Sequence, residues 1–268
     1  MTTHATDIAQ HILTSDISIP ELDVAPSPGV DPVDEIDWGE KGDKRLFVLT
    51  DGWKMAVNQP TLTKRQKQDV TLSQWFAGRR AAYEINRQYG IPRGETADKK
   101  PEEFFGIFRD EIGGIGWDLS SFVATKYHYQ NSENDVPEFL KNQLSSIGGS
   151  PDIQKACKDV RDWADQGKPN AKLFARKESP MRMVGKEYGD SFLHDDNLRF
   201  RAGFFSLDAN MDVKDWLVFQ VKNTDVKLWT FRGTVSCSNG SQLTDEIHDA
   251  LVKKYNSSGK GNIDGGKI

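Results

Sequence analysis

The chain has 268 residues, of which 37% are hydrophobic and 28% are charged, and its net charge at pH 7 is −5. With a mean hydropathy of −0.63, this composition predicts a soluble globular protein and excludes a largely disordered or membrane-spanning one. The two cysteines, Cys157 and Cys237, are too few for a disulfide framework and form no paired metal-ligand motif. A reduced, cytosolic folding environment is therefore expected.

The first 40 residues hold nine acidic residues and no Lys or Arg. We expect residues 1–43 to form a flexible acidic arm, which either is solvated or docks on a basic surface of the domain or of a partner. The arm has no secretory signal pattern, so we expect a protein that is cytoplasmic as synthesised. Export by a signal-independent route and membrane association through acylation both stay open. Residues 44–256 are expected to form a single α+β domain, and residues 257–268 a disordered tail.

The first folded elements are a strand and a long helix. Residues 44–53, KRLFVLTDGW, have the apolar content of a short strand closed by a turn. Thr63 and Gln66 have the spacing of a capping box, which predicts a helix start, and the segment 64–89 carries an apolar stripe at helical spacing. Its basic stretches, TKRQK and GRRAAYEINR, indicate a solvated face.

The middle of the chain predicts further helices around one strand. Pro101 opens a second helix, because proline is favoured in a first helical turn. Residues 120–130, SSFVATKYHYQ, have the β-branched and aromatic content of a strand. Helices are then expected over residues 135–147 and from Ser150 onward, and Cys157 lies in the apolar stripe of the latter helix, as a buried and unreactive thiol would.

From residue 172 the pattern becomes extended. KLFARKE and MRMVG are short strand candidates, while RFRAGFFSL, DWLVFQV and VKLWTFRGTVSC are stronger ones whose spacing suits an antiparallel meander. The segment LTDEIHDALVKKY predicts a last helix with Thr244 as its N-cap. The fold class predicted is α+β, with an antiparallel sheet, mainly from the C-terminal half, covered by several amphipathic helices.

Cys237 lies between the last predicted strand and the last predicted helix, where a thiolate gains from a helix N-terminus. Thr244, the best cap, is seven residues away, so this effect at the sulfur is expected to be small. A thiol hydrolase also needs an oriented base, and His194, beside Asp195 and Asp196, is the most suitable histidine. No recognised Cys-His motif is present, so no catalytic residue is assigned and we expect a protein that is not an enzyme.

Other kinds of site find little support in the sequence. There is no HExxH or CxxC pair, and DANMDVKDW lacks the Gly and terminal Glu of a calcium loop. The glycines of IGGIGW follow a predicted helix and precede a strand, the reverse of a phosphate-binding order. We therefore expect no metal and no phosphate-bearing cofactor. The acidic balance and the lack of a basic and aromatic groove motif predict no nucleic-acid partner.

Three segments together resemble a known family: LTKRQKQDVTLSQWFAGRRAA, IGGIGWDLSSFVATKYHY and NMDVKDWLVFQVKNTDVKLW. Over roughly residues 45 to 255, the chain is similar to the Erwinia virulence factor (Evf)-like family of α/β virulence proteins. The resemblance implies a non-enzymatic, toxin-like factor that carries palmitate in thioester linkage on a cysteine and acts at a membrane or on a host-surface protein.

If the resemblance extends to acylation, the lipid attachment site is Cys237 or, as the second choice, Cys157. A long acyl chain must reach an apolar space, and a thiol between an aromatic strand and an amphipathic helix can point into the gap between sheet and helices. Covalent palmitate is then the only added group expected. Two alternatives stay open, an unmodified protein-binding module and a cysteine-dependent hydrolase, and the oligomeric state is left open as well.

Overall fold

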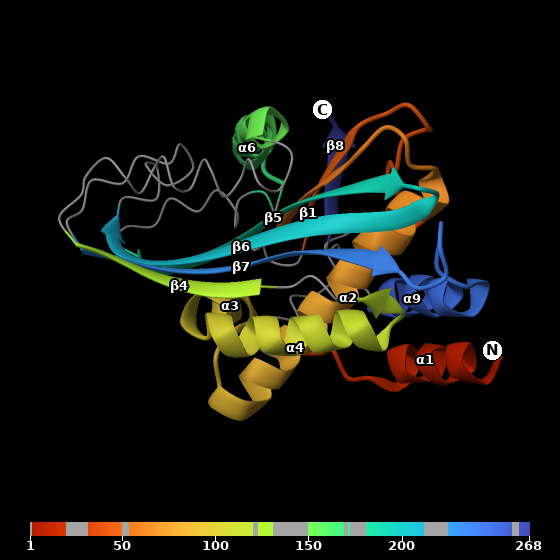
Figure 1. The fold of residues 1–268 in the computed structure, drawn as a ribbon, viewed down its shortest axis with the longest axis horizontal. Coiled ribbons are helices and arrows are strands. Elements are labelled where there is room, and N and C mark those ends of the chain that lie inside the picture. The colour runs from red at the N-terminus through yellow and green to blue at the C-terminus, as the bar shows by residue number, and fades with distance from the viewer. Residues whose placement is uncertain are drawn as a thin grey trace.

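The computed structural model describes residues 2–19, 32–49, 54–119, 123–130, 150–168, 171, 181–211, 225–258 and 263–268. The helix expected over residues 135–147 and the strand candidates KLFARKE and DWLVFQV lie outside these described residues. The structure forms one sheet with helices on both sides (Figure 1).

The described strands form a mixed, mostly antiparallel sheet in the order β3-β7-β6-β5-β2-β1-β8, and β4 pairs with β7 outside this path. The pair β2 and β5 is parallel, and the other pairs are antiparallel. The strands are β1 (Arg45–Leu49), β2 (Lys54–Asn58), β3 (Trp117–Asp118), β4 (Val123–Gln130), β5 (Met181–His194), β6 (Asn197–Met211), β7 (Asp225–Cys237) and β8 (Ile263–Lys267).

The α+β class is confirmed, but the expectation of a sheet mainly from the C-terminal half is wrong, because the strands are spread along the chain. β1 and β2 form a hairpin in which Arg45 pairs with Asn58. β2 then pairs in parallel with β5, where Lys54 lies opposite Glu187. The β2–β5 pairing joins segments more than 100 residues apart, and a short buried strand has no periodicity from which such a pairing could be predicted. The run KMAVN of β2 was not predicted as a strand for this reason.

The antiparallel meander is confirmed for the strands that the structure describes. β5 and β6 form a hairpin in which His194 pairs with Asn197. The two residues between them, Asp195 and Asp196, have φ of 49° and 58°. Positive φ at both central residues is typical of a type I′ turn, whose twist matches that of the strands. β7 continues the meander on the far side of β6.

Helices cover the sheet on both sides, as Figure 1 shows, with α6 above the strands and α1, α3, α4 and α9 below them in that view. The helical elements are α1 (Thr2–Thr14), α2 (Lys64–Tyr89), the 3-10 turn η3 (Arg93–Glu95), α3 (Thr96–Lys99), α4 (Pro101–Gly114), α6 (Ser150–Asp165) and α9 (Asp245–Ser257). The capping box of Thr63 and Gln66 is present, and the C-cap residue that follows α2 is Gly90, with φ 66°. A left-handed residue at this position suits glycine, which has no Cβ to clash.

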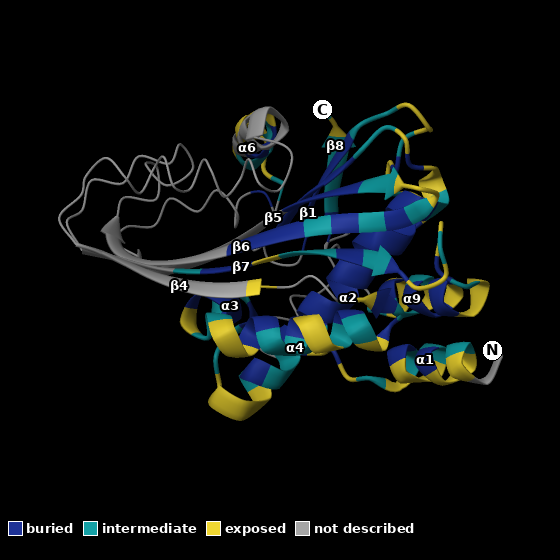
Figure 2. Ribbon diagram, in the orientation of Figure 1, coloured by how far each residue is buried: buried dark blue, intermediate teal, exposed yellow. Residues whose placement is uncertain are grey.

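Helix α2 is buried along most of its length (Figure 2). The expectation that its basic stretches form a solvated face is wrong at two positions, because Lys67 is 0% exposed and Arg79 is 1% exposed. The Lys67 ammonium donates to the main-chain oxygens of Glu40 and Asp43, at 2.8 and 2.9 Å. Segments from the first 43 residues therefore cover this face of α2.

The N-terminal residues form a helix and an extended stretch that pack on the domain. In place of the flexible arm expected over residues 1–43, α1 lies beside α9 (Figure 1), and Ile12 and Ile19 are fully buried. Further on, Trp38 is buried and its indole nitrogen donates to the oxygen of Val33 at 2.6 Å. The sequence left two alternatives for the acidic leader, a solvated arm and an arm that docks on a surface. The described residues of the leader dock on the domain.

The last residues also differ from the disordered tail expected over 257–268, because β8 pairs with β1. Edge pairing of this kind satisfies the main-chain groups of β1 that would otherwise face solvent. The placing of the domain boundaries at residues 43 and 256 stays a prediction.

The core joins the helices to the sheet through aromatic side chains. Phe105 on α4 lies 3.7 Å from Phe204 and 5.5 Å from Phe231, measured between ring centroids. Trp75 on α2 contacts Tyr255 on α9 at 4.9 Å in an edge-to-face arrangement. Such pairs favour offset or edge contacts and add to the free energy of area burial. Across the described ranges, none of the helices is both long and apolar enough to pass through a bilayer.

Candidate functional site

Cys237 is the last residue of β7, and its strand partner is Trp117 of β3. The cysteine is 4% exposed and belongs to the main hydrophobic core, together with Leu243 and Ile247. The next residue, Ser238, donates its amide to the oxygen of Gly116 at 3.0 Å. The sulfur therefore lies where the sheet ends and α9 begins, as the sequence predicts.

A tight turn separates Cys237 from α9. The amide of Gly240 donates to the Cys237 oxygen at 3.1 Å, and Gly240 has φ 85°. The Gly240 oxygen in turn accepts from the amide of Leu198 at 2.9 Å, which ties the turn to β6. Thr244 occupies the predicted N-cap position, but its side chain makes no capping hydrogen bond. Because α9 starts at Asp245, the sulfur lies outside its first turn, where the helix dipole has faded.

The surroundings of Cys237 hold its thiol in the protonated form. Burial raises its pKa from the ordinary value of 9.0 to about 11, the amide of Asn239 opposes this shift by donating to the sulfur, and the carboxylate of Asp69 adds to it. With this pKa, roughly one thiol in ten thousand is ionised at pH 7. The thiolate is the nucleophilic form of cysteine, so this arrangement disfavours attack on a substrate.

We expect the stability of the protein to fall between pH 9 and pH 11 because of Cys237. In this range the unfolded thiol is ionised while the native thiol, with its raised pKa, stays protonated. Unfolding then releases a proton, so rising pH favours the unfolded state, by at most about 2 kcal/mol. The measurement is urea unfolding from pH 8 to pH 11 for the wild type and Cys237→Ala. A stability difference between the two proteins that stays constant with pH would contradict the assignment.

A buried ion cluster lies beside the Cys237 turn, centred on Asp69 of α2. The Asp69 carboxylate lies 2.7 Å from Nδ1 of His248 and accepts from Nε of Arg65 at 3.1 Å and from the amide of Leu243 at 3.0 Å. Asp69 is 0% exposed and His248 is 8% exposed. A buried carboxylate requires such partners, because a charge without them is costly inside a protein. The cluster joins α2 to the start of α9.

The structure does not bring His194 into a buried site with Cys237. His194 lies at the tip of the β5–β6 hairpin, its side chain is 56% exposed, and its Nδ1 pairs with Asp195 at 2.9 Å. Within the described residues, the histidine that faces a buried carboxylate is His248, which sequence reasoning did not select. No sequence signal identifies this pair, because Asp69 and His248 are 179 positions apart. Among the described residues, neither His194 nor His248 forms a hydrogen bond with the Cys237 sulfur.

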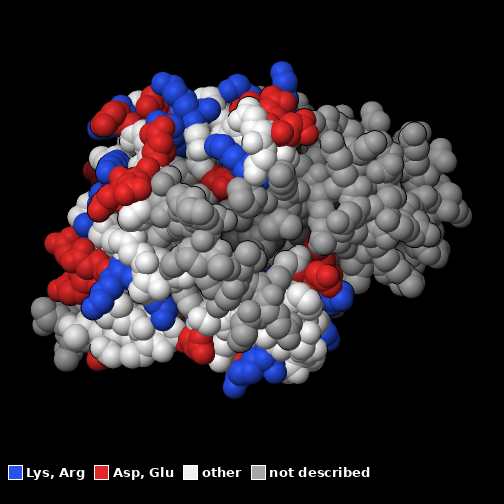
Figure 3. All heavy atoms as spheres, turned by 180° about the vertical axis from the view of Figure 1, so that it is seen from behind, with Lys and Arg blue, Asp and Glu red and all other residues white. Residues whose placement is uncertain are grey.

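The second predicted attachment site, Cys157, lies on α6, and its side chain falls outside the described residues. The described parts of the chain contain no group of three or more His, Cys, Asp or Glu side chains suited to a metal ion. Figure 3 shows the face of the molecule that is turned away from the viewer in Figure 1. Acidic and basic side chains are interspersed over the described part of this face, without a broad patch of one sign.

A surface pocket of about 220 Å³ lies next to β1. Arg45 binds Asp37 there through two hydrogen bonds of 2.8 and 2.6 Å. Asp43, also in the lining, accepts from Lys267 at 2.7 Å, and this hydrogen bond lowers the pKa of the Asp43 carboxyl group. The sequence analysis did not predict this pocket. The ion pairs of Arg45 with Asp37 and of Lys267 with Asp43 tie these two acidic residues to β1 and β8.

Comparison with solved structures gives a likeness at low sequence identity. No family model matches the sequence, and no curated protein matches it either. Among solved structures, the chain is similar to the "Structure of the Evf virulence factor", with 10% sequence identity, coverage of 78% of each chain and a TM-score of 0.32. That title names the virulence factor after which the family resembled by the sequence is called. At this identity and TM-score, its activity, partners and modification do not transfer to the present chain.

Proposed function

We propose that this protein is a non-enzymatic, virulence-type interaction factor that carries a palmitoyl group in thioester linkage on Cys237 and acts at a membrane or host surface. The observation that carries the proposal is the position of the Cys237 sulfur, buried at the seam between the sheet and α9 in the main core. Its raised pKa disfavours a role as a catalytic nucleophile. A covalently held apolar chain, by contrast, uses a cysteine that faces an apolar space.

The free energy of burying the acyl chain supports this role. A sixteen-carbon chain gains on the order of 10 kcal/mol when it leaves water, whether for a bilayer or for a protein interior. Side chains of Leu243 and Ile247 already lie close to the backbone at Gly116, where an added Cβ would be 3.8 and 3.7 Å from them. Because Cys237 is buried in the same cluster as Leu243 and Ile247, an acyl chain that entered the interior would displace side chains of this cluster, while a chain directed outward would be available to a membrane.

The burial of the thiol also bears on when it is acylated. Transfer from an acyl thioester requires the cysteine sulfur to attack the carbonyl carbon and to release the donor's thiol. Because the native Cys237 is nearly inaccessible and mostly protonated, this attack is expected before the chain completes folding. Acyl transfer to the folded protein is expected to be slow unless the seam between β7 and α9 opens.

The proposal is tested by the intact mass of protein purified from its native source, before and after neutral hydroxylamine, which cleaves thioesters. We expect a loss of about 238 Da, the mass of a palmitoyl group. The loss should be absent in Cys237→Ser and retained in Cys157→Ser, which is the matched control. The reverse pattern would move the attachment site to Cys157, and no loss from the wild type would exclude acylation.

The alternative of an unmodified protein-binding module is favoured by a separate observation. Residues 2–19 pack on the domain in the way that a bound peptide packs on a protein. Their isoleucines are buried, and their main-chain oxygens accept hydrogen bonds from the side chains of Arg79, Arg80 and Lys254. Loss of acylation would leave this alternative standing, since the two rest on different parts of the molecule.

A further inference from the structure

The N-terminal segment, residues 2–19, has the form of a helical peptide with an extended continuation. α1 ends at Thr14, and residues 15–19 run on without further helix. Ile8 and Ile12 are one helical turn apart, and Ile17 and Ile19 alternate with exposed residues as in an extended chain. All four isoleucines are at most 8% exposed. The segment therefore presents one apolar face in both of its parts.

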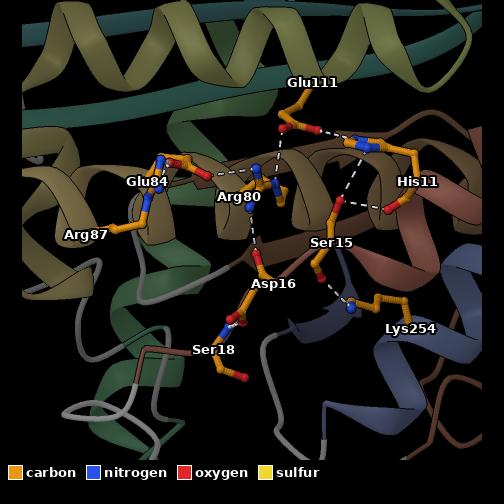
Figure 4. Close-up of polar contacts among 9 residues, drawn as sticks. All are labelled: His11, Ser15, Asp16, Ser18, Arg80, Glu84, Arg87, Glu111 and Lys254. Carbon is orange, nitrogen blue, oxygen red and sulfur yellow. Dashed lines mark hydrogen bonds and ion pairs between the residues drawn. The ribbon is translucent and has the colours of Figure 1, made fainter.

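The surface that receives this segment, which we call the docking surface, comprises Phe76, Arg79 and Arg80 of α2, Glu111 of α4 and Lys254 of α9. Figure 4 shows how His11 and Ser15 meet it. Nε2 of His11 lies 2.9 Å from Glu111, and the His11 ring lies edge-on to Phe76 with centroids 6.1 Å apart. Nε of Arg80 donates to the same Glu111 carboxylate at 3.1 Å.

Three cations of the docking surface bind the main chain of the segment. Lys254 donates to the oxygens of Leu13 and Ser15 at 3.1 and 2.5 Å. Arg80 donates to the oxygen of Asp16 at 2.7 Å, and Arg79 to that of Ile17 at 2.9 Å. Burial lowers the pKa of Lys254 from its ordinary value, which indicates that the contact is partly removed from water. Hydrogen bonds from charged donors are the stronger kind.

The chain leaves the docking surface and returns to nearly the same place. The Ser15 oxygen binds Lys254, and the amide of Val33 donates to the side chain of Asn256 at 2.9 Å, two residues farther along α9. Residues 20–31 connect these two anchored parts. Twelve residues can span up to about 40 Å when extended, far more than a return to the same helix requires. The same length allows the segment to reach the docking surface of another molecule.

We propose that the docking surface is a peptide-binding site and that the N-terminal segment of a second copy of this chain occupies it when two copies exchange their segments. The contacts that residues 11–17 make with Phe76, Arg79, Arg80, Glu111 and Lys254 lie between the segment and the docking surface, so they form equally well within one molecule or between two. At low concentration the intramolecular contact prevails, because the tether gives it an effective concentration in the millimolar range. Exchange of an identical element is a common route to a dimer. The proposal does not depend on acylation.

The test combines two defective full-length chains. Ile12→Asp places a charge on the apolar face of the segment and leaves the docking surface intact. The double variant Arg80→Ala, Lys254→Ala removes three main-chain hydrogen bonds from the docking surface and leaves the segment intact. By light scattering, each variant alone is expected near 30.2 kDa, and an equal mixture is expected to form a heterodimer of about twice that mass. A mixture that remains monomeric overturns the proposal.

The matched control replaces the exposed neighbour Lys253. A chain with Lys253→Ala keeps both a sound segment and a sound docking surface, so its own segment competes within the molecule. Mixed with Ile12→Asp at the same concentration, it is expected to give at least about tenfold less heterodimer. Equal amounts of heterodimer in the two mixtures would show that dimerisation does not use the docking surface.

A second measurement covers the case in which Ile12→Asp fails to fold. The milder variant Ile8→Ala then replaces it, and a synthetic peptide of residues 2–19 is added to the full-length chain. The peptide is expected to raise the thermal midpoint of the variant, because a ligand that binds the native state stabilises it. The same peptide with Ile12→Asp should have no effect. Equal stabilisation by an unrelated amphipathic peptide, or none by either peptide, would overturn recognition of a second copy.

Discussion

Asp69→Asn is expected to destabilise the protein by about 3 kcal/mol, because it removes the charge at the centre of the buried cluster. The carboxylate accepts from Arg65 and from the Leu243 amide and faces Nδ1 of His248. An amide offers one oxygen where the carboxylate offers two, so it turns an NH2 group toward a donor. At roughly 2–4 °C per kcal/mol for a chain of this size, the thermal midpoint should fall by about 6–12 °C.

The matched control is Asp245→Asn, since Asp245 pairs with the same Arg65 at 3.1 Å but its side chain is 79% exposed. An exposed ion pair of this kind contributes less than about 1 kcal/mol, so we expect a midpoint close to that of the wild type. Thermal unfolding of both variants followed by circular dichroism makes the comparison. Equal effects of the two substitutions would mean that burial of Asp69 does not determine its contribution.

Phe105→Ala is expected to cost about 3–5 kcal/mol, the range for removing a large aromatic side chain from a packed core. Phe105 is 1% exposed and contacts Phe204, Trp229 and Phe231 of the sheet, at centroid distances of 3.7, 5.9 and 5.5 Å. The substitution leaves a cavity between α4 and the sheet, because the neighbouring rings are held on the paired strands β6 and β7. Urea unfolding at pH 7 gives the difference in the free energy of unfolding.

Tyr89→Ala serves as the control, because Tyr89 is 40% exposed and its ring carries the Lys100 ammonium at 4.2 Å from the centroid. A cation–π contact at an exposed site contributes about 0.5–1 kcal/mol. The stability lost in Tyr89→Ala should therefore be several times smaller than the stability lost in Phe105→Ala. A cost for Phe105→Ala below that of Tyr89→Ala would contradict the place of Phe105 at the centre of the core.

Local elements with strong periodicity were predictable from the sequence. The capping box at Thr63, the helix that follows it and the strand ending at Cys237 are all present. Each depends on residues close together in the chain, where side-chain spacing and capping chemistry act directly. The sequence predicted neither β2 nor the packing of the N-terminal residues on the domain. β2 is a run of five residues that pairs with the distant β5, and the acidic leader takes its structure from contacts with α2, α4 and α9.

The candidate site divides in the same way. The position of Cys237 between a strand and a helix follows from the local sequence, and its burial agrees with an apolar corner. Among the described side chains, the histidine that faces a buried carboxylate is His248 and not His194, because α9 packs on α2 and brings His248 to Asp69. A contact between residues 179 positions apart leaves no local mark. The acids beside His194 in the sequence, by contrast, lie with it on an exposed turn.

The sequence by itself determined the α+β class, the long helix α2, the antiparallel strands β6 and β7 and the place of Cys237 at the end of β7. Hydrophobic period, capping residues and turn residues carry this information because they act over a few positions. The tertiary structure alone decided that β1, β2 and β8 join the sheet, that residues 2–19 dock on α2, α4 and α9, and that burial, with a further contribution from Asp69, raises the pKa of Cys237. These features arise when packing excludes water from groups far apart in the chain, and exclusion of water is what strengthens charge interactions and shifts pKa values.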